Sequence, residues 1–428
     1  MKHMNAPPVN RKILFLAYYF PPLGMGGTQR VAKWSKYLSR AGWEVTVVTV
    51  KPIIYYAQDE SLLEELRGVK IIRAGSLDPA RLFYLLGKKN APSQARQRGW
   101  GNLLYWLLLP DSRILWAPFA AWRAWQEIRK HKISYVLSSG PPHSAHLIGW
   151  LLSRFMPIRW LADFRDTWLL DESTQAPTAL HRFLHRALER VMTRNAHVLT
   201  AVSQGLLRQL EQNGARRSGT SFYIPNGYDP EDFIALPRPA HERFELAFSG
   251  AISAYTIPRS FLAGFRYFID TAQLTPNEVR LNFAGADLTG EFLLWVKEQS
   301  LEAYLNWRGY VAHEAALATL QQADVLVYIV TEGVGETIIP SKTFEYLAAR
   351  KPVLAIGEKI EGMKILLEHA ACRYCAFNAV DDIARSLLAF YAEFHQKTLP
   401  ASPEQTEIFS RAFQAEQLAA LLEAHAPT

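Results

Sequence analysis

Cysteine is almost absent from this chain, since its 428 residues include only Cys372 and Cys375. Two cysteines cannot build a disulfide framework or a four-cysteine zinc site. Their CxxC spacing allows a redox pair, but such motifs open a helix, whereas residues 372–377 have the pattern of a short strand. We therefore expect two small apolar side chains at these positions.

Long hydrophobic runs are missing as well. The longest apolar stretches, 103–109 and 147–152, are much shorter than the ~20 residues that a membrane-spanning helix needs. Residues 1–11 contain no apolar targeting core. These absences predict a cytoplasmic protein that does not span a membrane.

What is present is the composition of an ordinary globular protein, with 49% hydrophobic and 20% charged residues. A chain of this length exceeds the usual size of one hydrophobic core, so we expect two domains. The formal net charge of +7 favours an anionic partner, which by charge alone is nucleic acid, a nucleotide diphosphate or an anionic membrane. Zinc-finger spacings, RNA-binding signatures and dense basic runs are missing, so nucleic acid is not expected.

The order of predicted elements indicates two α/β domains. Short β-branched runs alternate with helical patterns, which is typical of βα units and parallel sheets. The alternation breaks at 237–240 and then begins again. We therefore expect domains at residues 10–237 and 243–400, followed by a final helix at 405–424 that is free to pack elsewhere.

A glycine-rich loop follows the first predicted strand. Gly24, Gly26 and Gly27 precede a helix that we expect to begin around Gln29. Glycines at such a place let backbone amides approach a phosphate, and the helix dipole favours its charge. A tight βα turn would use the same glycines, and the loop does not have the dinucleotide GxGxxG pattern. Both interpretations stay open.

A second anion site is predicted in the later domain. Pro340 and Ser341 open a helix whose first turn offers the free amides of Ser341, Lys342 and Thr343, with the Lys342 charge beside them. Glu345, one turn further on, can accept two hydrogen bonds from a vicinal diol such as a ribose. A plainly capped helix with exposed Lys and Glu side chains is the alternative.

Polar residues follow two strands of the first domain. Asp163, Arg165 and Asp166 come after the predicted strand 158–162, at the carboxyl end where ligands of open α/β sheets collect. Asp166 is a candidate general base or polar anchor for an acceptor hydroxyl, or else half of an Asp–Arg pair that holds a loop. His143 follows the preceding strand and is either a catalytic candidate or a structural histidine.

Basic and aromatic residues gather at 81–125. The basic residues are Arg81, Lys88, Lys89, Arg96 and Arg98, and the aromatic ones are Trp100, Trp106, Trp116, Trp122 and Trp125. Together they suit the interface of an anionic membrane, where rings lie at the headgroup level. Core helices and an aromatic-lined acceptor cleft would use the same residues, so these alternatives stay open.

Taken together, these segments resemble the group 1 glycosyltransferases, family 4 of the GT-B fold, of the type found in bacterial surface-polysaccharide pathways. The stretches that match follow the family's order and are 20–31, 139–149, 162–168, 224–229, 248–250 and 340–355. The resemblance implies two Rossmann-like domains whose parallel sheets face each other across a cleft. It also implies that the final helix crosses back onto the first domain.

The resemblance assigns roles on the donor side. The second domain would bind a nucleotide-diphosphate sugar, with Glu345 on the ribose and Lys342 at the diphosphate. The other implied diphosphate contacts are the amides of Ser341 and Thr343, the side chain of Arg259, and Gly26 and Gly27 of the first domain. Family members commonly carry a further glutamate, associated with the transferred sugar, at the position that Thr337 occupies here; Glu336 lies one residue away.

The resemblance also implies a reaction. The family retains the anomeric configuration without a metal or a cofactor, so Asp166 or His143 would orient the acceptor. A glycan or lipid-linked acceptor at the inner membrane face is the expectation, motivated by residues 81–125. Two other classes share the fold: a nucleotide-sugar epimerase, which needs no acceptor, and a catalytically silent GT-B protein that only binds.

Overall fold

The computed structural model describes residues 10–426 except 25, 56–57, 88–107, 170–175, 177, 215–218, 234–240, 334–338 and 404–405. The chain divides into two compact units. Unit 1 is Met1–Pro225 with Arg411–Thr428, and unit 2 is Asn226–Ser410. The sequence placed the change of domain at residues 237–243, whereas the chain leaves unit 1 after Pro225.

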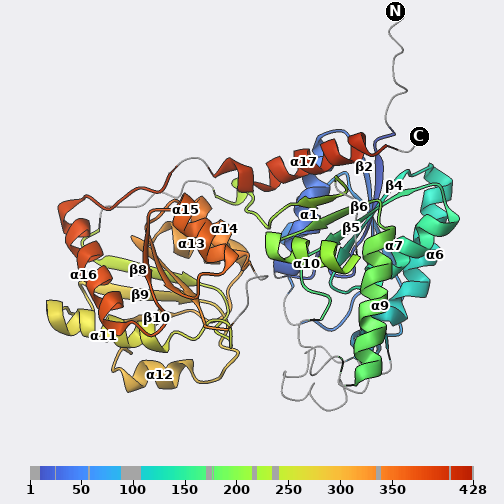
Figure 1. The fold of residues 1–428 in the computed structure, drawn as a ribbon. Helices are drawn as coiled ribbons and strands as arrows, with labels where there is room; N and C mark the ends of the chain where they lie inside the picture. The colour runs from blue at the N-terminus through green and yellow to red at the C-terminus, as the bar shows by residue number, and fades with distance from the viewer. Residues whose placement is uncertain are drawn as a thin grey trace, which may run out of the picture. The chain divides into compact units, whose positions relative to one another are not determined.

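Unit 1 is built on a seven-stranded parallel sheet of order β3-β2-β1-β4-β5-β6-β7 (Figure 1). Its strands are β1 (Lys12–Leu16), β2 (Glu44–Val50), β3 (Lys70–Ala74), β4 (Tyr135–Gly140), β5 (Arg159–Phe164), β6 (Val198–Ala201) and β7 (Ser221–Tyr223). The winding reverses between β1 and β4, so loops diverge there at the carboxyl edge, the usual place for a ligand.

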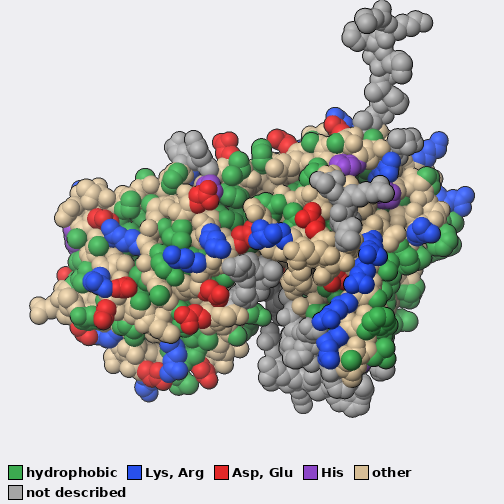
Figure 2. All heavy atoms as spheres, viewed as in Figure 1, with side chains coloured by type: hydrophobic (Ala, Val, Ile, Leu, Met, Phe, Trp, Pro, Cys, Tyr) green, Lys and Arg blue, Asp and Glu red, His purple; other side chains and the backbone are tan. Residues whose placement is uncertain are grey.

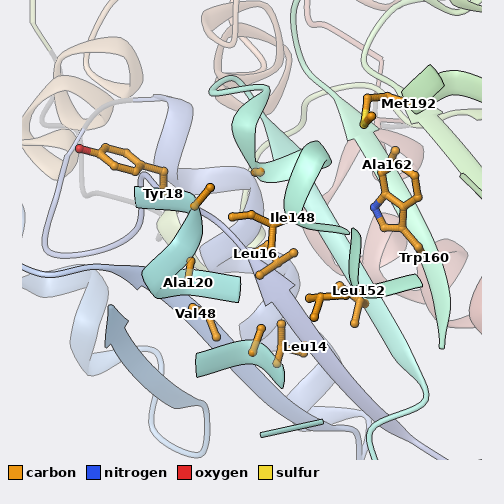
Figure 3. Packing of buried hydrophobic residues seen from close by; sticks show 14 of the residues in the cluster. Leu14, Leu16, Tyr18, Val48, Ala120, Ile148, Leu152, Trp160, Ala162 and Met192 are labelled. Atoms are coloured by element: carbon orange, nitrogen blue, oxygen red, sulfur yellow. The ribbon is translucent and has the colours of Figure 1, made fainter. Parts of the chain in front are cut away.

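Helices cover both faces of this sheet, so the strands β4 and β6 are buried along their whole length. They are α1 (Gly26–Arg40), α2 (Ser61–Glu64), α3 (Pro79–Leu85), the 3-10 turn η1 (Ser112–Trp116), α6 (Ala117–His131), α7 (Ser144–Phe155), α9 (Ala179–Asn195), α10 (Gln204–Gly214) and α17 (Arg411–Ala424). Figure 3 shows one face, where Leu14 and Leu16 of β1 pack with Ile148 and Leu152 of α7. Ile13 of the same strand belongs to the cluster on the opposite face.

The final helix belongs to unit 1, as the fold prediction required. Ala415, Leu418 and Leu422 of α17 share a buried cluster with Val31 and Leu38 of α1. The helix begins at Arg411, later than the expected 405, because the 3-10 turn η3 (Glu407–Phe409) comes first. A single apolar stripe therefore holds the C-terminus to the first unit.

Unit 2 repeats the architecture with a six-stranded parallel sheet of order β10-β9-β8-β11-β12-β13. Its strands are β8 (Phe244–Ser249), β9 (Val279–Ala284), β10 (Leu305–Trp307), β11 (Val325–Val330), β12 (Val353–Gly357) and β13 (Cys372–Cys375). Its helices are η2 (Pro230–Asp232), α11 (Arg259–Ala272), α12 (Phe292–Glu298), α13 (His313–Gln321), α14 (Lys342–Ala349), α15 (Glu361–His369), α16 (Val380–Gln396) and η3.

The two cysteines lie where the sequence placed them, in a strand. Cys372 and Cys375 are the ends of β13, and residues three apart in a strand point to opposite faces. Burial raises the pKa of both thiols, that of Cys372 to about 12. Neither thiol is ionised at neutral pH, so they are packing residues and not a redox pair.

Candidate functional site

The helix α14 of unit 2 is fixed at the carboxyl ends of two strands by buried hydroxyl groups. The Tyr346 hydroxyl donates to the Val327 carbonyl at 3.0 Å and accepts the Ser249 N–H at 3.1 Å. The Thr343 hydroxyl lies 2.8 Å from that of Tyr328 on β11. These contacts hold the first turn of α14 against β8 and β11, so its position does not depend on a ligand.

Lys342, the first residue of α14, is a cation in apolar surroundings. Its Nζ lies 4.5 Å from the ring centroid of Phe248 and 5.2 Å from that of Tyr328. Among the described residues, the one hydrogen bond of this ammonium group is long, 3.4 Å, to the Ile329 carbonyl. Burial lowers the pKa of Lys342 to about 7, although the Glu345 charge opposes this shift. A bound anion would supply the counter-charge and return this pKa towards its ordinary value.

The backbone amides at this helix end are only partly as expected. The Thr343 N–H donates to the Pro340 carbonyl at 3.0 Å, so the prediction that this amide is free is wrong. The chain tightens into a turn there before the regular helix begins. Within the described part of the chain, the Ser341 and Lys342 amides have no hydrogen-bond partner. Two amides, not three, are therefore available to an anion.

Glu345 lies one turn further along α14 and is half-buried. Among the residues that the structure describes, no donor hydrogen-bonds to its carboxylate. A half-buried carboxylate with both oxygens available can accept two hydrogen bonds from a vicinal diol. Glu345 thus keeps the capacity that the sequence predicted for it. Thr337 and Glu336 lie outside the described residues.

A close backbone approach shapes the strand ends beside Lys342. A Cβ atom on Gly285 would lie 1.8 Å from the Gly250 carbonyl oxygen, so no side chain fits there. Gly250 itself has φ +129°, which residues with a side chain rarely adopt. The loops after β8 and β9 therefore cross closely, and a Cβ on Gly250 would contact the Lys342 side chain at 3.5 Å.

Arg259, the other predicted diphosphate partner, already has contacts within unit 2. It opens α11, pairs with Glu298 at 3.1 Å and lies 5.5 Å from the Trp295 ring centroid, both on α12. Arg259 is 58% exposed, and an ion pair at such a site contributes about 0–1 kcal/mol. The pair is weak enough to exchange for a phosphate, so the role of Arg259 stays a prediction.

In unit 1, the glycine-rich loop is tied to its neighbours by Arg165. The helix α1 begins at Gly26, earlier than the expected Gln29. The Arg165 guanidinium donates to the carbonyls of Gly27 and Pro141, and its Nε to that of Gly140 at 3.3 Å. Arg165 therefore joins the first turn of α1 to the loop before α7, and it holds a positive charge beside the glycines that are predicted to approach a phosphate.

A buried ion pair, which the sequence analysis did not single out, organises the same edge. Arg30 and Asp163 are both 0% exposed and form a bidentate contact, with 2.8 Å between Nη2 and Oδ1. Asp163 also accepts the hydroxyls of Ser139 and Thr200, each at 2.8 Å. The remaining Arg30 N–H groups reach the carbonyls of residues 224 and 225. This network joins α1, β4, β5 and β6.

Asp166 is a carboxylate of a different kind. It is half-buried, and no hydrogen bond from the described residues reaches it. Burial raises the pKa of Asp166 to about 6, while the neighbouring Arg165 opposes the shift. A carboxyl group with this pKa is mostly ionised at neutral pH and can accept a proton or a hydrogen bond from a hydroxyl. Its role as base or acceptor anchor remains a prediction.

His143 lies in a buried aromatic stack. Its ring is stacked on Trp168 at 4.5 Å between centroids, and its Nε2 lies 3.3 Å from the Thr167 carbonyl. Burial lowers the pKa of His143 to about 4, so the ring is neutral at pH 7. A neutral ring held this way fixes the loop that carries Asp166. This corresponds to the structural role that the sequence analysis gave as the alternative for His143.

Two neighbouring histidines, His143 and His146, each have one ring nitrogen in a polar contact. Because Nε2 of His143 faces a carbonyl, it carries the proton, and Nδ1 is left as an acceptor. Nδ1 of His146 lies 2.8 Å from the Ser138 hydroxyl. His143 Nδ1 and His146 Nε2 have no hydrogen-bond partner in the described structure. Both lie close to Gly140, where an added Cβ atom would be 3.1 Å from His143 Nδ1 and 2.6 Å from His146 Nε2.

The region 81–125 is only partly described, because residues 88–107 lie outside. Trp116 is fully buried and contacts Tyr18 edge-on, so for this residue the core alternative of the sequence analysis holds. Trp122 is 58% exposed and stacks on Trp125. The α3 helix and its ends expose apolar side chains: Leu77, Leu82, Phe83, Tyr84, Leu85 and Leu86. Arg81 lies in the first turn of the same helix.

Residues 25–227, nearly half of the chain, match the family described as the glycosyl transferase 4-like domain. No curated protein sequence matches the chain. The matched residues lie almost entirely in unit 1 and include Gly26, Gly27, Asp166 and His143.

Solved structures match over nearly the whole length. A sucrose-phosphate synthase from Thermosynechococcus elongatus has a TM-score of 0.61 at 15% identity, over 97% of this chain and 100% of that one. A lipopolysaccharide outer core galactosyltransferase has a TM-score of 0.57 at 14% identity, over 96% of this chain and 99% of that one. A putative UDP-N-acetylglucosamine 2-epimerase from Listeria monocytogenes has a TM-score of 0.55 at 12% identity, over 97% of this chain and 96% of that one. These similarities establish the GT-B fold, and with the matched domain they support a group 1 glycosyltransferase.

Proposed function

We propose that this chain, whose first unit carries a glycosyl transferase 4-like domain, is a retaining hexosyltransferase. It moves a sugar from a nucleotide-diphosphate sugar onto a glycan or a lipid-linked acceptor. The observation that supports this most is the first turn of α14, where the poorly paired Lys342 cation lies one helical turn before the carboxylate of Glu345. A cation and a diol acceptor at that spacing suit a nucleoside diphosphate.

On the donor side, each group of this turn meets one part of the nucleotide. Lys342 and the amides of Ser341 and Lys342 bind the diphosphate, where the positive end of the helix dipole adds to the attraction. Glu345 accepts hydrogen bonds from the two ribose hydroxyls. The proposed donor site also includes Arg259 and the Gly26 and Gly27 loop of unit 1. Thr343 takes part indirectly, because its hydroxyl contacts Tyr328 of β11 and so holds the helix start in place.

In the reaction, the bond between the anomeric carbon and the diphosphate oxygen breaks, and the acceptor hydroxyl oxygen forms its bond on the same face. The acceptor proton passes to the departing diphosphate. Lys342 and the helix-end amides stabilise the charge that develops on that leaving group, and neither a metal nor a cofactor is required. Asp166 orients the acceptor hydroxyl, and His143 supports the loop that carries Asp166.

The acceptor side fits a lipid-linked molecule. Leu85 is 62% and Leu86 74% exposed at the end of α3, next to Arg81. Apolar side chains with a neighbouring cation suit the interface of an anionic membrane. We therefore place the protein in the cytoplasm at the inner face of a bacterial membrane, in the synthesis of surface polysaccharide. Within the described residues, no helix is long and apolar enough to cross a bilayer.

An epimerase is the second candidate, because a putative 2-epimerase is among the proteins that share the fold over the whole chain. It would convert the nucleotide sugar in the absence of any acceptor. A catalytically silent binding protein would hold the nucleotide and convert nothing. Incubating each donor with and without acceptor, and analysing the products, separates the three functions.

The experiment that tests the donor site is a thermal-shift screen against the diphosphates of uridine, guanosine, adenosine and cytidine and their sugars. At ~100 times its dissociation constant, a ligand of the folded state stabilises it by about 2.7 kcal/mol. One base should raise the midpoint, and Glu345→Gln should weaken the effect. The exposed Glu302→Gln is the matched control and should bind as the wild type does. No shift with any nucleotide would contradict the proposal.

A further inference from the structure

The segment that carries Asp166 has little main-chain support. It follows β5, and residues 166–168 form no backbone–backbone hydrogen bond with another described residue. Side-chain contacts hold the segment instead: His143 Nε2 lies 3.3 Å from the Thr167 carbonyl, and the Trp168 ring stacks on that of His143. Only Thr167 separates Asp166 from Trp168, so the position of Asp166 depends on how Trp168 is held.

The stack on His143 fixes only part of the orientation of Trp168. The two ring centroids are 4.5 Å apart, and the ring planes are 13° from parallel. Stacking sets the plane of a ring but tolerates sliding within that plane, because dispersion has little directionality. A hydrogen bond at the edge of the ring supplies the missing direction. Trp168 is 6% exposed, and a buried indole N–H normally finds such a partner.

The partner of Trp168 is His185 on α9. The Trp168 Nε1–H donates to His185 Nδ1 at 3.1 Å. An indole nitrogen can only donate, so His185 Nδ1 is unprotonated and, in a neutral ring, Nε2 carries the proton. His185 is 2% exposed, and burial lowers its pKa, which keeps the ring neutral at pH 7. A charged His185 has a proton on both nitrogens and could not accept this hydrogen bond.

The two sides of α9 differ in the polar residues that they carry. Figure 2 shows Lys and Arg side chains following one another over the part of unit 1 where this helix lies. On the inward side, His185, Glu189 and Thr193 are polar and buried, and their spacing of four residues places them one above the next. The Thr193 hydroxyl donates to the Glu189 carbonyl at 2.9 Å within the helix, whereas the His185 and Glu189 side chains bond to residues outside it.

Glu189 offers the acceptor that His185 needs. Its Oε2 accepts the Asn213 amide of α10 at 3.1 Å. Glu189 Oε1 and His185 Nε2 are both buried and have no hydrogen-bond partner among the described residues. Cβ atoms at this spacing are about 5–6 Å apart, so the N–H and the carboxylate oxygen are within reach of each other, directly or through one water.

A hydrogen bond from His185 would also stabilise the charge of Glu189. Burial raises the pKa of Glu189 to about 7, although the Asn213 bond and the charges of Arg186 and Arg190 oppose the shift. A donor to the ionised carboxylate lowers its pKa again. In return, the carboxylate keeps the proton of the imidazole on Nε2 and leaves Nδ1 as the acceptor for Trp168.

We propose that His185 is a positioning residue for Asp166. Its Nδ1 holds the edge of the Trp168 ring while His143 holds the face, and together they set the segment 165–168 at the carboxyl edge of the sheet. Glu189 selects the tautomer of His185 that this contact requires. The inference rests on the proposed function only in what Asp166 does, because where Asp166 lies is measured without any substrate.

The test follows Trp168 and Asp166 by nuclear magnetic resonance in the full, deuterated chain, labelled at the indole nitrogens and the aspartate carboxyl carbons, with no ligand added. Trp168→Phe and Asp166→Asn assign the two signals by their loss. His185→Leu should speed hydrogen exchange of the Trp168 indole N–H about tenfold, the effect of one lost hydrogen bond. It should also lower the pKa of Asp166 from about 6 towards 3.8, because a loosened segment gives the carboxyl group more water.

Further variants separate positioning from a general loss of packing. His185→Asn places an oxygen near the position of Nδ1, so it should keep both the slow exchange and the raised pKa of Asp166. Trp168→Phe keeps a ring against the stack but has no N–H, so it should lower the pKa of Asp166 as His185→Leu does, and the double variant should add nothing. The matched control, the exposed His395→Leu on α16, should change neither reading.

An Asp166 pKa that stays at about 6 in both His185→Leu and Trp168→Phe would overturn the proposal, and so would His185→Asn behaving like His185→Leu. Circular dichroism checks folding, and Trp168→Phe decides if His185→Leu does not fold. Glu189→Leu should move both readings in the same direction by less, since Nδ1 is still present. If the pKa of Asp166 follows His185 but Asp166→Asn leaves sugar transfer unchanged, the positioning is supported and the proposed role of Asp166 in the reaction is wrong.

Discussion

Arg30 of unit 1 and Lys342 of unit 2 occupy similar places, each on a helix that follows a strand at the carboxyl edge of a parallel sheet, but their partners differ. Arg30 is completely buried, forms a bidentate pair with Asp163 and donates to two carbonyls. Among the described residues, the ammonium group of Lys342 lies near two aromatic rings and makes one long hydrogen bond, and its pKa is lowered. A cation whose hydrogen bonds are complete holds a fold together, whereas one whose partners are incomplete is available to a ligand.

The carboxylates at the carboxyl edges of the two sheets also differ in how many hydrogen bonds they accept. Asp163 accepts five hydrogen bonds, and the Arg30 charge beside it helps to hold its pKa low in spite of complete burial. Asp166 and Glu345 are half-buried and accept no hydrogen bond from the described residues. Buried polar groups are normally satisfied, so these two carboxylates beside strand ends are the ones that we propose to accept hydrogen bonds from a substrate.

The largest effect should come from breaking the closed network. Arg30→Met leaves Asp163 buried without its counter-charge, and removing one partner of such a pair costs about 3–5 kcal/mol. We expect the free energy of unfolding of unit 1, measured by urea denaturation, to fall by that amount. Arg266→Met, which removes an exposed i,i+4 pair with Asp270, should cost about 0.3–0.5 kcal/mol. A small loss from Arg30→Met would mean that the pair is not the organising contact of this edge.

The same type of change at Lys342 should have the opposite effect on stability. The folded pKa of about 7 lies below the unfolded value of 10.5, so at neutral pH the unfolded chain binds more protons and the buried lysine lowers stability. Lys342→Gln should therefore not destabilise unit 2, but it should weaken nucleotide binding about 10- to 100-fold through a lost charged hydrogen bond.

A pH series sharpens the Lys342 prediction. Wild-type affinity for the diphosphate should decrease as the pH rises above about 7, because the neutral lysine no longer attracts the anion. Isothermal titration of Lys342→Gln should show no such decrease. Equal pH dependence in both proteins would assign the effect to another group, and a strongly destabilised Lys342→Gln would contradict the contrast with Arg30.

The buried histidine of unit 1 should make this unit sensitive to acid. The pKa of His143 is about 4 in the folded state and 6.5 when exposed, so stability is complete above 6.5 and is lost as the pH falls towards 4. At about pH 5 the loss from this group is about 2 kcal/mol. His143→Phe keeps a ring against Trp168 and should flatten the dependence of urea stability on pH between 7 and 5. An unchanged slope would exclude His143 as its source.

The smallest effect is expected at Asp166. Because burial raises its pKa to about 6, the charged carboxylate does not stabilise the fold at neutral pH, and Asp166→Asn should leave the urea midpoint unchanged or slightly raised. If Asp166 anchors the acceptor, steady-state kinetics should show an acceptor KM that is about tenfold higher, from one lost hydrogen bond to a charged group. A loss of stability without a kinetic change would return Asp166 to the loop-holding role.

Much of the fold follows from local patterns in the sequence. Strands β2 and β11 lie on the runs 44–50 and 325–330, which are rich in β-branched residues, a pattern that specifies buried parallel strands. Helix starts were less accurate: α1 begins at Gly26 and α17 at Arg411. Glycine and a preceding 3-10 turn do not signal a boundary in the way that a capping side chain does.

For the sites, the sequence by itself determined which residue types lie at the strand ends: the Ser341 to Glu345 helix start, Asp166, His143 and the glycine-rich loop. Only the tertiary structure decided what each can do. Arg30 and Asp163 are 133 residues apart in the chain, so their pairing could not be seen before the strands were assembled. Burial and the completeness of hydrogen bonding are properties of the packed structure, and they separate the cation that stabilises unit 1 from the one that unit 2 offers to a ligand.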